Sequence, residues 1–319
     1  MKRFLLAICV AMAMMLVVGP AFATELWDPH LRGADGGLVA AALPPPGFYF
    51  INDFYFAPNY AGYGPNFGTT DGTRNNNVKL FAYVDVPILL WTPGCQFLGA
   101  DYGVAIAQPF DYTNLRVNTG LNAQGNNTWV GGDQWGTFNT LLIPYILSWK
   151  LPYDFRVKTS FSIGFNDATT RPGSVQSGGP YAQSGNGTYM FTPVVGLSWL
   201  HEGWNVSGEF FFTFQTENDG THYQSGDQFA ADYTITYTYQ KWTFGLVAAQ
   251  ENQVENDKIS GISRNDSKAE AYTMGPTLGY NFGPCSLSFT YNWTLYANNE
   301  VGGDWFNLRL VVPLGNPYK

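Results

Sequence analysis

The stretch Phe155–Phe165, FRVKTSFSIGF, decides the fold class of this chain. Apolar or β-branched side chains occupy every second position, and polar or small residues fill the positions between them. Successive side chains of a β-strand point to opposite faces, so the pattern predicts a strand with one apolar and one polar face. Its length matches the roughly ten residues that a tilted strand needs to cross a bilayer.

The same alternation returns at 229–239, 287–295 and 306–314. Extending the count along the chain gives twelve expected strands, an even number as a single-chain bacterial barrel requires. The sequence therefore predicts an all-β protein, a transmembrane antiparallel up-and-down β-barrel of about twelve strands. The expected strands lie near residues 47–57, 77–87, 96–110, 135–149, 154–166, 187–199, 204–217, 228–240, 241–252, 268–282, 285–297 and 303–314.

Short and long connections alternate between these strands. The long ones are rich in Gly, Asn, Ser and Asp, which indicates short periplasmic turns at one end and long extracellular loops at the other. Tryptophans flank the short connections, where a girdle would place amphipathic rings at the membrane interface. The expected long loops are 58–76, 111–133, 166–186, 218–227 and 253–267, and the tryptophans are Trp91, Trp149, Trp199, Trp204 and Trp242.

Composition agrees with a membrane barrel and excludes some other classes. The 319 residues are 45% hydrophobic and only 13% charged, and the net charge of -8 leaves no basic face for nucleic acid. A soluble β-sandwich would show the same periodicity. Strand length, the number of aromatic residues on one face and the secretion signal favour the membrane.

The N-terminus predicts export. Residues 1–23 have the basic start, apolar run and small-residue end of a signal peptide. The segment 24–46 is expected in the periplasm, either as a plug in the barrel mouth or as a cover of the seam between the first and last strands. Residues 47–319 form the expected barrel. Cys95 and Cys285 fall in turns that are not neighbours, so we expect two unpaired thiols.

If the apolar face meets lipid, the opposite face lines the lumen and carries most of the charged residues. Unpaired charges there would be costly, so the groups must be hydrated or matched across the lumen. They either orient a polar group of a solute in an open pore or form a salt-bridge network that fills a narrow barrel. The expected lumen residues are Asp53, Lys79, Asp85, Asp101, Arg156, Lys158, Glu209, Asp232, Glu251, Glu270 and Arg309.

An enzymatic role is not expected. Hydrolases need a His near a Ser or a carboxylate, and His30, His201 and His222 lie in the N-terminal segment, a short turn and a long loop. Asp219 and Asp227 are not part of a regular oxygen-ligand loop. We therefore expect no catalytic residues, no metal site and no cofactor.

Three prolines, Pro144, Pro193 and Pro276, fall inside expected strands. A closed barrel has no free edge where a missing N–H is harmless. Each proline is interpreted first as a bulge that adds curvature. The alternative is a local opening of the wall through which an apolar solute leaves sideways.

Three segments resemble the outer-membrane family named for the meta-pathway of phenol degradation: Leu43–Phe50 (LPPPGFYF), Val86–Trp91 (VPILLW) and Leu98–Gly103 (LGADYG). The resemblance extends over most of residues 43–314. It implies a β-barrel that acts as a transporter or channel for aromatic or other hydrophobic compounds.

The expected function is thus passive uptake of small aromatic or hydrophobic solutes through the bacterial outer membrane, with outer-membrane lipid and the barrel-assembly machinery as further partners. The alternative is a structural or surface-interaction barrel with an occluded lumen.

Overall fold

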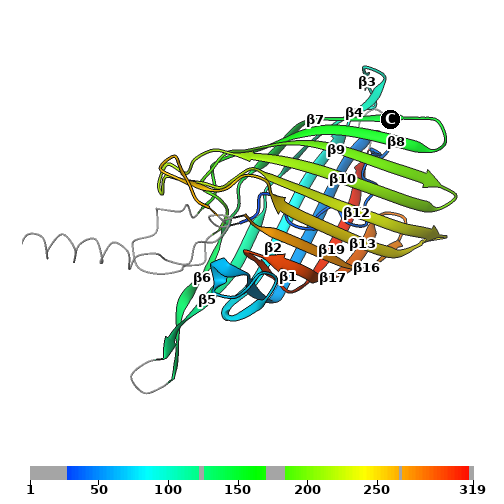
Figure 1. Cartoon of the computed structure of the whole chain (residues 1–319). Coiled ribbons are helices and arrows are strands. Elements are labelled where there is room, and N and C mark those ends of the chain that lie inside the picture. Colours follow the sequence, from blue (N-terminus) through cyan, green and yellow to red (C-terminus); the bar gives the residue numbers. More distant parts are fainter. Residues whose placement is uncertain (1–26, 122–125, 170–183, 266–267, 316–319) are drawn as a thin grey trace, which may run out of the picture.

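The computed structural model describes residues 27–121, 126–169, 184–265 and 268–315, which form one closed antiparallel barrel of twelve strands (Figure 1). No described helix is long and apolar enough to cross a membrane. The wall consists of β1 (Gly47–Tyr63), β2 (Arg74–Thr92), β4 (Ala100–Ala107) with β5 (Phe110–Leu121), β6 (Asn127–Thr137) with β7 (Leu141–Lys150), β8 (Phe155–Gly164), β9 (Met190–His201), β10 (Trp204–Gln215), β12 (Gln228–Tyr239), β13 (Trp242–Gln253), β16 (Glu270–Asn281), β17 (Ser286–Asn298) and β19 (Asp304–Gly315).

The barrel closes because β1 pairs with both β19 and β2. β4 pairs with Ile88–Trp91 at the end of β2, and β5 pairs with Val78–Asp85 of the same strand. β4 and β5 are therefore one strand that bends at Gln108 and Pro109. β6 and β7 are likewise one strand bent at 138–140. Counting each bent pair once gives the twelve strands that the sequence predicts.

Shorter elements lie at the ends of the barrel. They are η1 (Pro65–Phe67), β3 (Gln96–Phe97), β11 (Tyr223–Gln224), β14 (Lys258–Ile259), β15 (Ile262–Ser263) and β18 (Glu300–Gly302). β11, β14 and β15 form a three-stranded sheet over the long-loop end.

Two expected long loops contain strand residues. Much of 58–76 belongs to the ends of β1 and β2, and most of 111–133 is the hairpin of β5 and β6, which projects beyond the rest of the wall (Figure 1). The glycines of this hairpin made the segment look like a loop in the sequence. The close pairing of the two strands nevertheless requires glycine, since a Cβ on Gly131 would lie 2.0 Å from the Leu115 carbonyl oxygen. Tyr112 and Trp135 pack across the two strands with ring centroids 4.8 Å apart.

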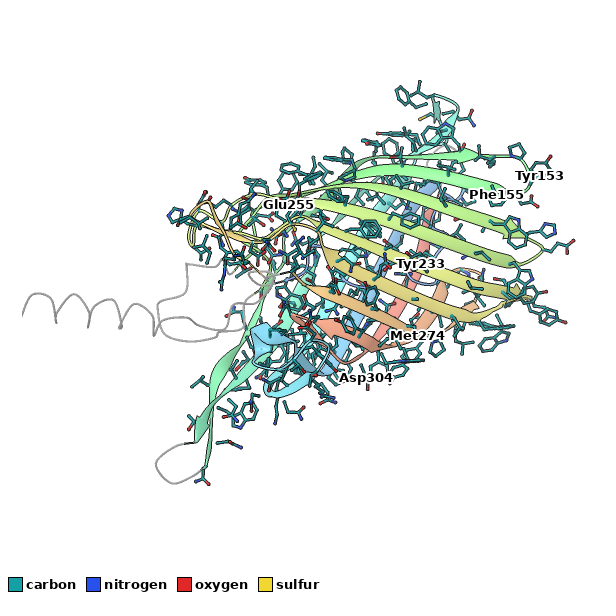
Figure 2. The ribbon with its side chains drawn as sticks, viewed as in Figure 1. Tyr153, Phe155, Tyr233, Glu255, Met274 and Asp304 are labelled. Carbon is teal, nitrogen blue, oxygen red and sulfur yellow. The ribbon has the colours of Figure 1, made fainter. Side chains whose placement is uncertain are left out.

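The predicted alternation is confirmed by side-chain exposure. On β12 Ile235 is 53% exposed while Thr234 is 3% exposed, and on β19 Leu308 is 42% exposed while Asn307 is 3% exposed. On these strands the apolar residues therefore face outward to lipid. Aromatic pairs surround the end with short turns, among them Trp204 with Tyr237, and Figure 2 labels Tyr153 and Phe155 at this end.

The prolines differ in their effect on the wall. Around Pro144 the register shifts on both sides of β7, so the bulge is confirmed there. Pro193 sits opposite Phe161 and Pro276 opposite Leu246, and both ladders keep one register, so the bulge interpretation is wrong at these two positions. Cys95 and Cys285 are free thiols.

Candidate functional site in the lumen

The N-terminal segment, residues 27–46, runs through the inside of the barrel from one end to the other. At the long-loop end the Trp27 backbone N–H donates to Asn186 at 3.0 Å. Near the other end the Ala41 N–H donates to Ser198 at 2.9 Å, and Thr92 donates to the Pro45 carbonyl at 2.8 Å. The segment thus extends from one end of the barrel to the other and contacts the last strand through Arg309 and the first strand through Tyr55. A role as a plug or as a cover of the seam stays a prediction.

Polar side chains of the lumen hold the backbone of this segment. Asp232 accepts hydrogen bonds from the N–H groups of Gly33 and Asp35, both at 2.8 Å, and Thr234 accepts one from Gly37 at 2.9 Å. Irregular backbone inside a membrane protein needs such partners, because each unpaired buried group is costly. The polar face of the alternating strands therefore positions an internal chain.

A buried ion pair fixes the middle of the segment to the wall. Arg309 on β19 is 2% exposed, and its Nε lies 2.6 Å from Oδ1 of Asp53 on β1. The same guanidinium donates to the carbonyl oxygens of Gly36 and Ala34. Arg309 therefore joins two strands and the segment at one point.

A second arginine points the other way, from the segment to the wall. Nε of Arg32 lies 3.2 Å from Glu251, and its Nη2 lies 3.7 Å from Glu300 and 3.5 Å from Asp28. Nη2 also donates to the Val301 carbonyl at 2.9 Å. One cation thus faces three carboxylates, so its loss would leave several buried charges without a partner.

His30 and Lys158 complete the charged contacts of the lumen. His30 stacks on Phe211 with ring centroids 3.9 Å apart, and its Nε2 lies 3.1 Å from Asp232. Lys158 donates to Glu209. Ring nitrogen and carboxylate oxygens of His30, Asp35 and Asp232 come within 4.8 Å of one another, the spacing of a metal site. Asp232 already accepts three hydrogen bonds there, so this group serves as an anchor.

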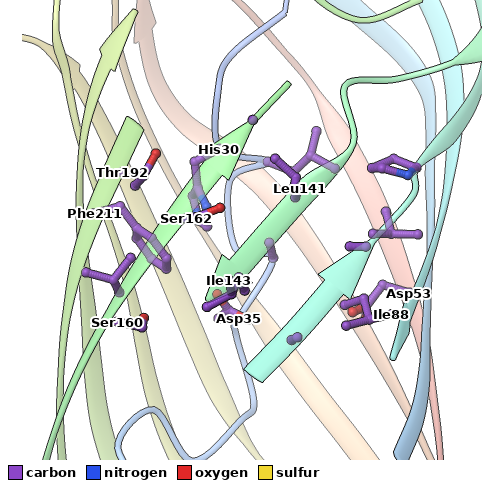
Figure 3. A pocket seen from close by; sticks show the side chains of 18 of the residues that line it. His30, Asp35, Asp53, Ile88, Leu141, Ile143, Ser160, Ser162, Thr192 and Phe211 are labelled. Carbon is purple, nitrogen blue, oxygen red and sulfur yellow. The ribbon is translucent and has the colours of Figure 1, made fainter. Parts of the chain in front are cut away.

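A cavity of about 290 Å³ lies between the segment and the barrel wall (Figure 3). One side is aliphatic and comes from β1, β2, β4 and β7. The opposite side is formed by β8, β9 and β10 with hydroxyl groups and the Lys158–Glu209 pair, while His30 and Asp35 reach in from the segment. The aliphatic side includes Ile51, Val84, Val86, Ile88, Leu90, Ala105, Ala107, Leu141 and Ile143, and the hydroxyl groups are those of Ser160, Ser162 and Thr192.

The structure brings together only part of the expected lumen set. Asp53, Lys158, Glu209, Asp232, Glu251 and Arg309 point inward and lie in the ion pairs above. Asp101 and Arg156 are on the inner side of β4 and β8 but lie near the short turns, and Asp101 accepts a hydrogen bond from Gln96. A role of these residues in binding a solute stays a proposal.

Lys79, Asp85 and Glu270 point outward, which corrects their expected place in the lumen. On β2 the even positions, Val84 and Val86 among them, line the cavity, so the odd positions face out. Asp85 accepts a hydrogen bond from Asn52 at 2.6 Å there, and Lys79 lies over the Trp129 ring. Glu270 alternates with buried Ala271 on β16.

The reason for this error is that β2 is apolar on both faces. A lone charge then does not mark the polar side, because the lumen side is itself aliphatic where it borders the cavity. The sequence also missed Asp35 and Phe211, and assessed His30 only as a catalytic base. Their positions in the sequence do not indicate that they line a cavity, because the cavity exists only once the segment lies inside the barrel.

His30 predicts a pH-dependent stability. Burial alone would lower its pKa, but the carboxylates of Asp232, Asp35 and Glu209 outweigh burial and raise the pKa above 6.5. A folded pKa above the unfolded one gives a stability that is complete below about pH 6.5 and is lost as the pH rises through the folded pKa. We expect this component of the unfolding free energy to disappear in His30→Gln.

The measurement is urea unfolding of the lipid-reconstituted protein at a series of pH values. His222→Gln, which changes an exposed loop histidine beside Glu217, is the control and should keep the wild-type pH profile. Identical profiles for wild type and His30→Gln would contradict the assignment.

The comparisons with known proteins agree with this architecture. The family model of the MetA-pathway of phenol degradation matches residues 64–310, more than half of the chain. None of the curated proteins is similar to this chain in sequence.

Among solved structures, the COG4313 outer membrane channel from Pseudomonas putida F1 is similar over 86% of this chain and 97% of its own, with 15% identity and a TM-score of 0.64. The Pseudomonas putida toluene transporter TodX matches over 91% of this chain and 98% of its own, with 11% identity and a TM-score of 0.43. The closed barrel with its apolar outer face is a protein of the bacterial outer membrane. The chain belongs to the phenol-degradation MetA-pathway family of outer-membrane β-barrels.

Proposed function

We propose that this barrel is an outer-membrane channel for passive uptake of small aromatic or hydrophobic solutes, which pass through its lumen. The observation that carries the proposal is the largely aliphatic cavity inside the barrel, in a place where a water-filled porin would be polar. An apolar cavity of roughly 150 Å³ is enough to hold benzene. At about 290 Å³, this cavity accommodates a molecule of one or two rings.

The family and the similar solved structure support the same function. The family is named for phenol degradation, and the COG4313 protein is described as an outer membrane channel. Insertion by the barrel-assembly machinery is part of the proposal, since a closed barrel of this kind must be placed in the outer membrane as a whole.

A structural barrel with an occluded lumen is the second candidate. Its support is the segment itself, which is held by Arg32, Arg309 and Asp232 and narrows the lumen along its length. The two candidates differ in one property: an occluded barrel passes neither ions nor solutes.

We propose no enzymatic activity. His201 pairs with Asp154 at the surface of a short turn, and His222 pairs with Glu217 in a loop. His30 faces Asp232 and the ring of Phe211. A hydrolase needs a nucleophile within reach of the imidazole. The contacts named for the three rings, among the described residues, are carboxylates and aromatic rings, and this supports the proposal.

Filling the cavity tests the uptake function. Ala107 is 6% exposed and lines the cavity, whereas the adjacent Ile106 points to lipid with 45% exposure. We expect Ala107→Trp to abolish the reduction of ion current by toluene in a planar bilayer, because the indole occupies the solute's space. Ile106→Trp is the matched control and should respond like wild type. A wild-type protein that conducts no ions and takes up no aromatic solute would overturn the proposal.

A further inference from the structure

Asp35 stands out among the acidic groups that line the cavity because its carboxylate is in no ion pair with a described residue. Asp53 pairs with Arg309, Glu209 with Lys158, and Asp28 with Arg32. None of the residues that the structure describes forms a hydrogen bond or ion pair with the Asp35 carboxylate. The backbone of Asp35 donates its N–H to Asp232 and accepts a hydrogen bond from the Leu38 N–H. The carboxylate nevertheless lines the aliphatic cavity (Figure 3).

Its neighbour His30 does not supply a cation for the Asp35 carboxylate. The imidazole is engaged by Asp232 at 3.1 Å, so even a protonated His30 leaves two carboxylates facing one cation. The only other cation on the described cavity wall, Lys158, is taken by Glu209. The cavity thus combines an aliphatic wall with a carboxylate that has no ion-pair partner among the described residues.

Resting on the uptake function above, we propose that Asp35 is the specificity-determining residue of the cavity and selects apolar molecules with a cationic head, namely primary amines on an aromatic or short aliphatic body. The apolar part of the amine packs against the aliphatic wall at Ile88 and Ile143, and its ammonium group donates a hydrogen bond to the Asp35 carboxylate. An ammonium ion forms an ion pair with the Asp35 carboxylate, a neutral hydroxyl supplies a hydrogen bond alone, and a carboxylate ligand is repelled by the like charge.

Four ligands with the same ring and different heads test this order. Benzylamine, benzyl alcohol, toluene and benzoate are titrated against the full-length protein in detergent by calorimetry, and the reduction of ion current is recorded in bilayers. For wild type we expect the affinity to fall in the order given. Asp35→Asn should weaken benzylamine about tenfold, leave toluene unchanged and tighten benzoate.

The controls separate this proposal from the uptake function. Asp219→Asn changes an exposed loop carboxylate and should leave all four affinities unchanged. Equal binding of the four heads, or equal weakening of benzylamine and toluene in Asp35→Asn, would overturn the selection by Asp35 while aromatic uptake stands. Failure of every ligand to bind wild type would overturn both. Heat-modifiable migration on a gel confirms that each variant is folded.

Discussion

Removing residues 27–43 is expected to raise the single-channel conductance several-fold. These residues occupy the lumen from Trp27 near Asn186 to Ala41 near Ser198. Without them the interior of a twelve-stranded barrel is an open, hydrated channel. The polar side chains that now hold the segment would be solvated by water instead. The measurement is the conductance of the purified variant in a planar bilayer.

A point substitution tests the same expectation without shortening the chain. Gly33 has φ +71°, and a Cβ there would lie 2.9 Å from the Trp305 ring, so Gly33→Leu displaces the segment locally. Gly261→Leu, at φ +77° with open space around it, controls for the backbone conformation alone. Conductance should rise in Gly33→Leu and not in Gly261→Leu. Wild-type conductance in both the deletion and Gly33→Leu would mean that the segment does not obstruct the path.

Arg309→Ala is expected to cost about 3–5 kcal/mol of unfolding free energy, the usual penalty for breaking a buried ion pair. The substitution leaves Asp53 buried without a cation and removes the donors to the Gly36 and Ala34 carbonyls. Tryptophan fluorescence during urea unfolding in lipid vesicles measures the loss.

A double substitution separates the charge from the packing. Replacing both partners, in Arg309→Met with Asp53→Leu, should recover most of the stability because no buried charge remains unpaired. Arg116→Ala removes an arginine of β5 whose hydrogen bonds within the described part of the chain go to neutral groups, Asn114 and the Gly131 carbonyl. This substitution should cost less than about 1 kcal/mol. An Arg309→Ala variant as stable as Arg116→Ala would show that the buried pair contributes little.

Strands with one polar face could be predicted well from the sequence. On β8 and β12 alternation alone assigns the faces, because lipid on one side and the polar lumen on the other impose opposite demands on neighbouring residues. On β2 both sides are apolar, so the period-2 signal disappears and Asp85 was assigned to the wrong face. The β5–β6 hairpin was missed because the glycines it needs also mark loops.

The candidate site could be predicted only in part. The paired charges Asp53 and Arg309 follow from strand register, since both occupy inward positions on adjacent strands. Asp35 and His30 do not follow, because their surroundings depend on the path of the N-terminal segment, which has no periodicity and is fixed by contacts with strands roughly 200 residues away in sequence.

Photolabelling tests the central claim, that solutes occupy the cavity inside the barrel, most directly. A small phenyl diazirine partitions into lipid as well as into the protein, so it should modify both Ile88 and Ile143 in the cavity and Leu246 on the outer face. Excess toluene should then remove the label from Ile88 and Ile143, as counted by mass spectrometry, and leave Leu246 labelled. Label confined to the outer face, or cavity label that toluene does not displace, would contradict the account.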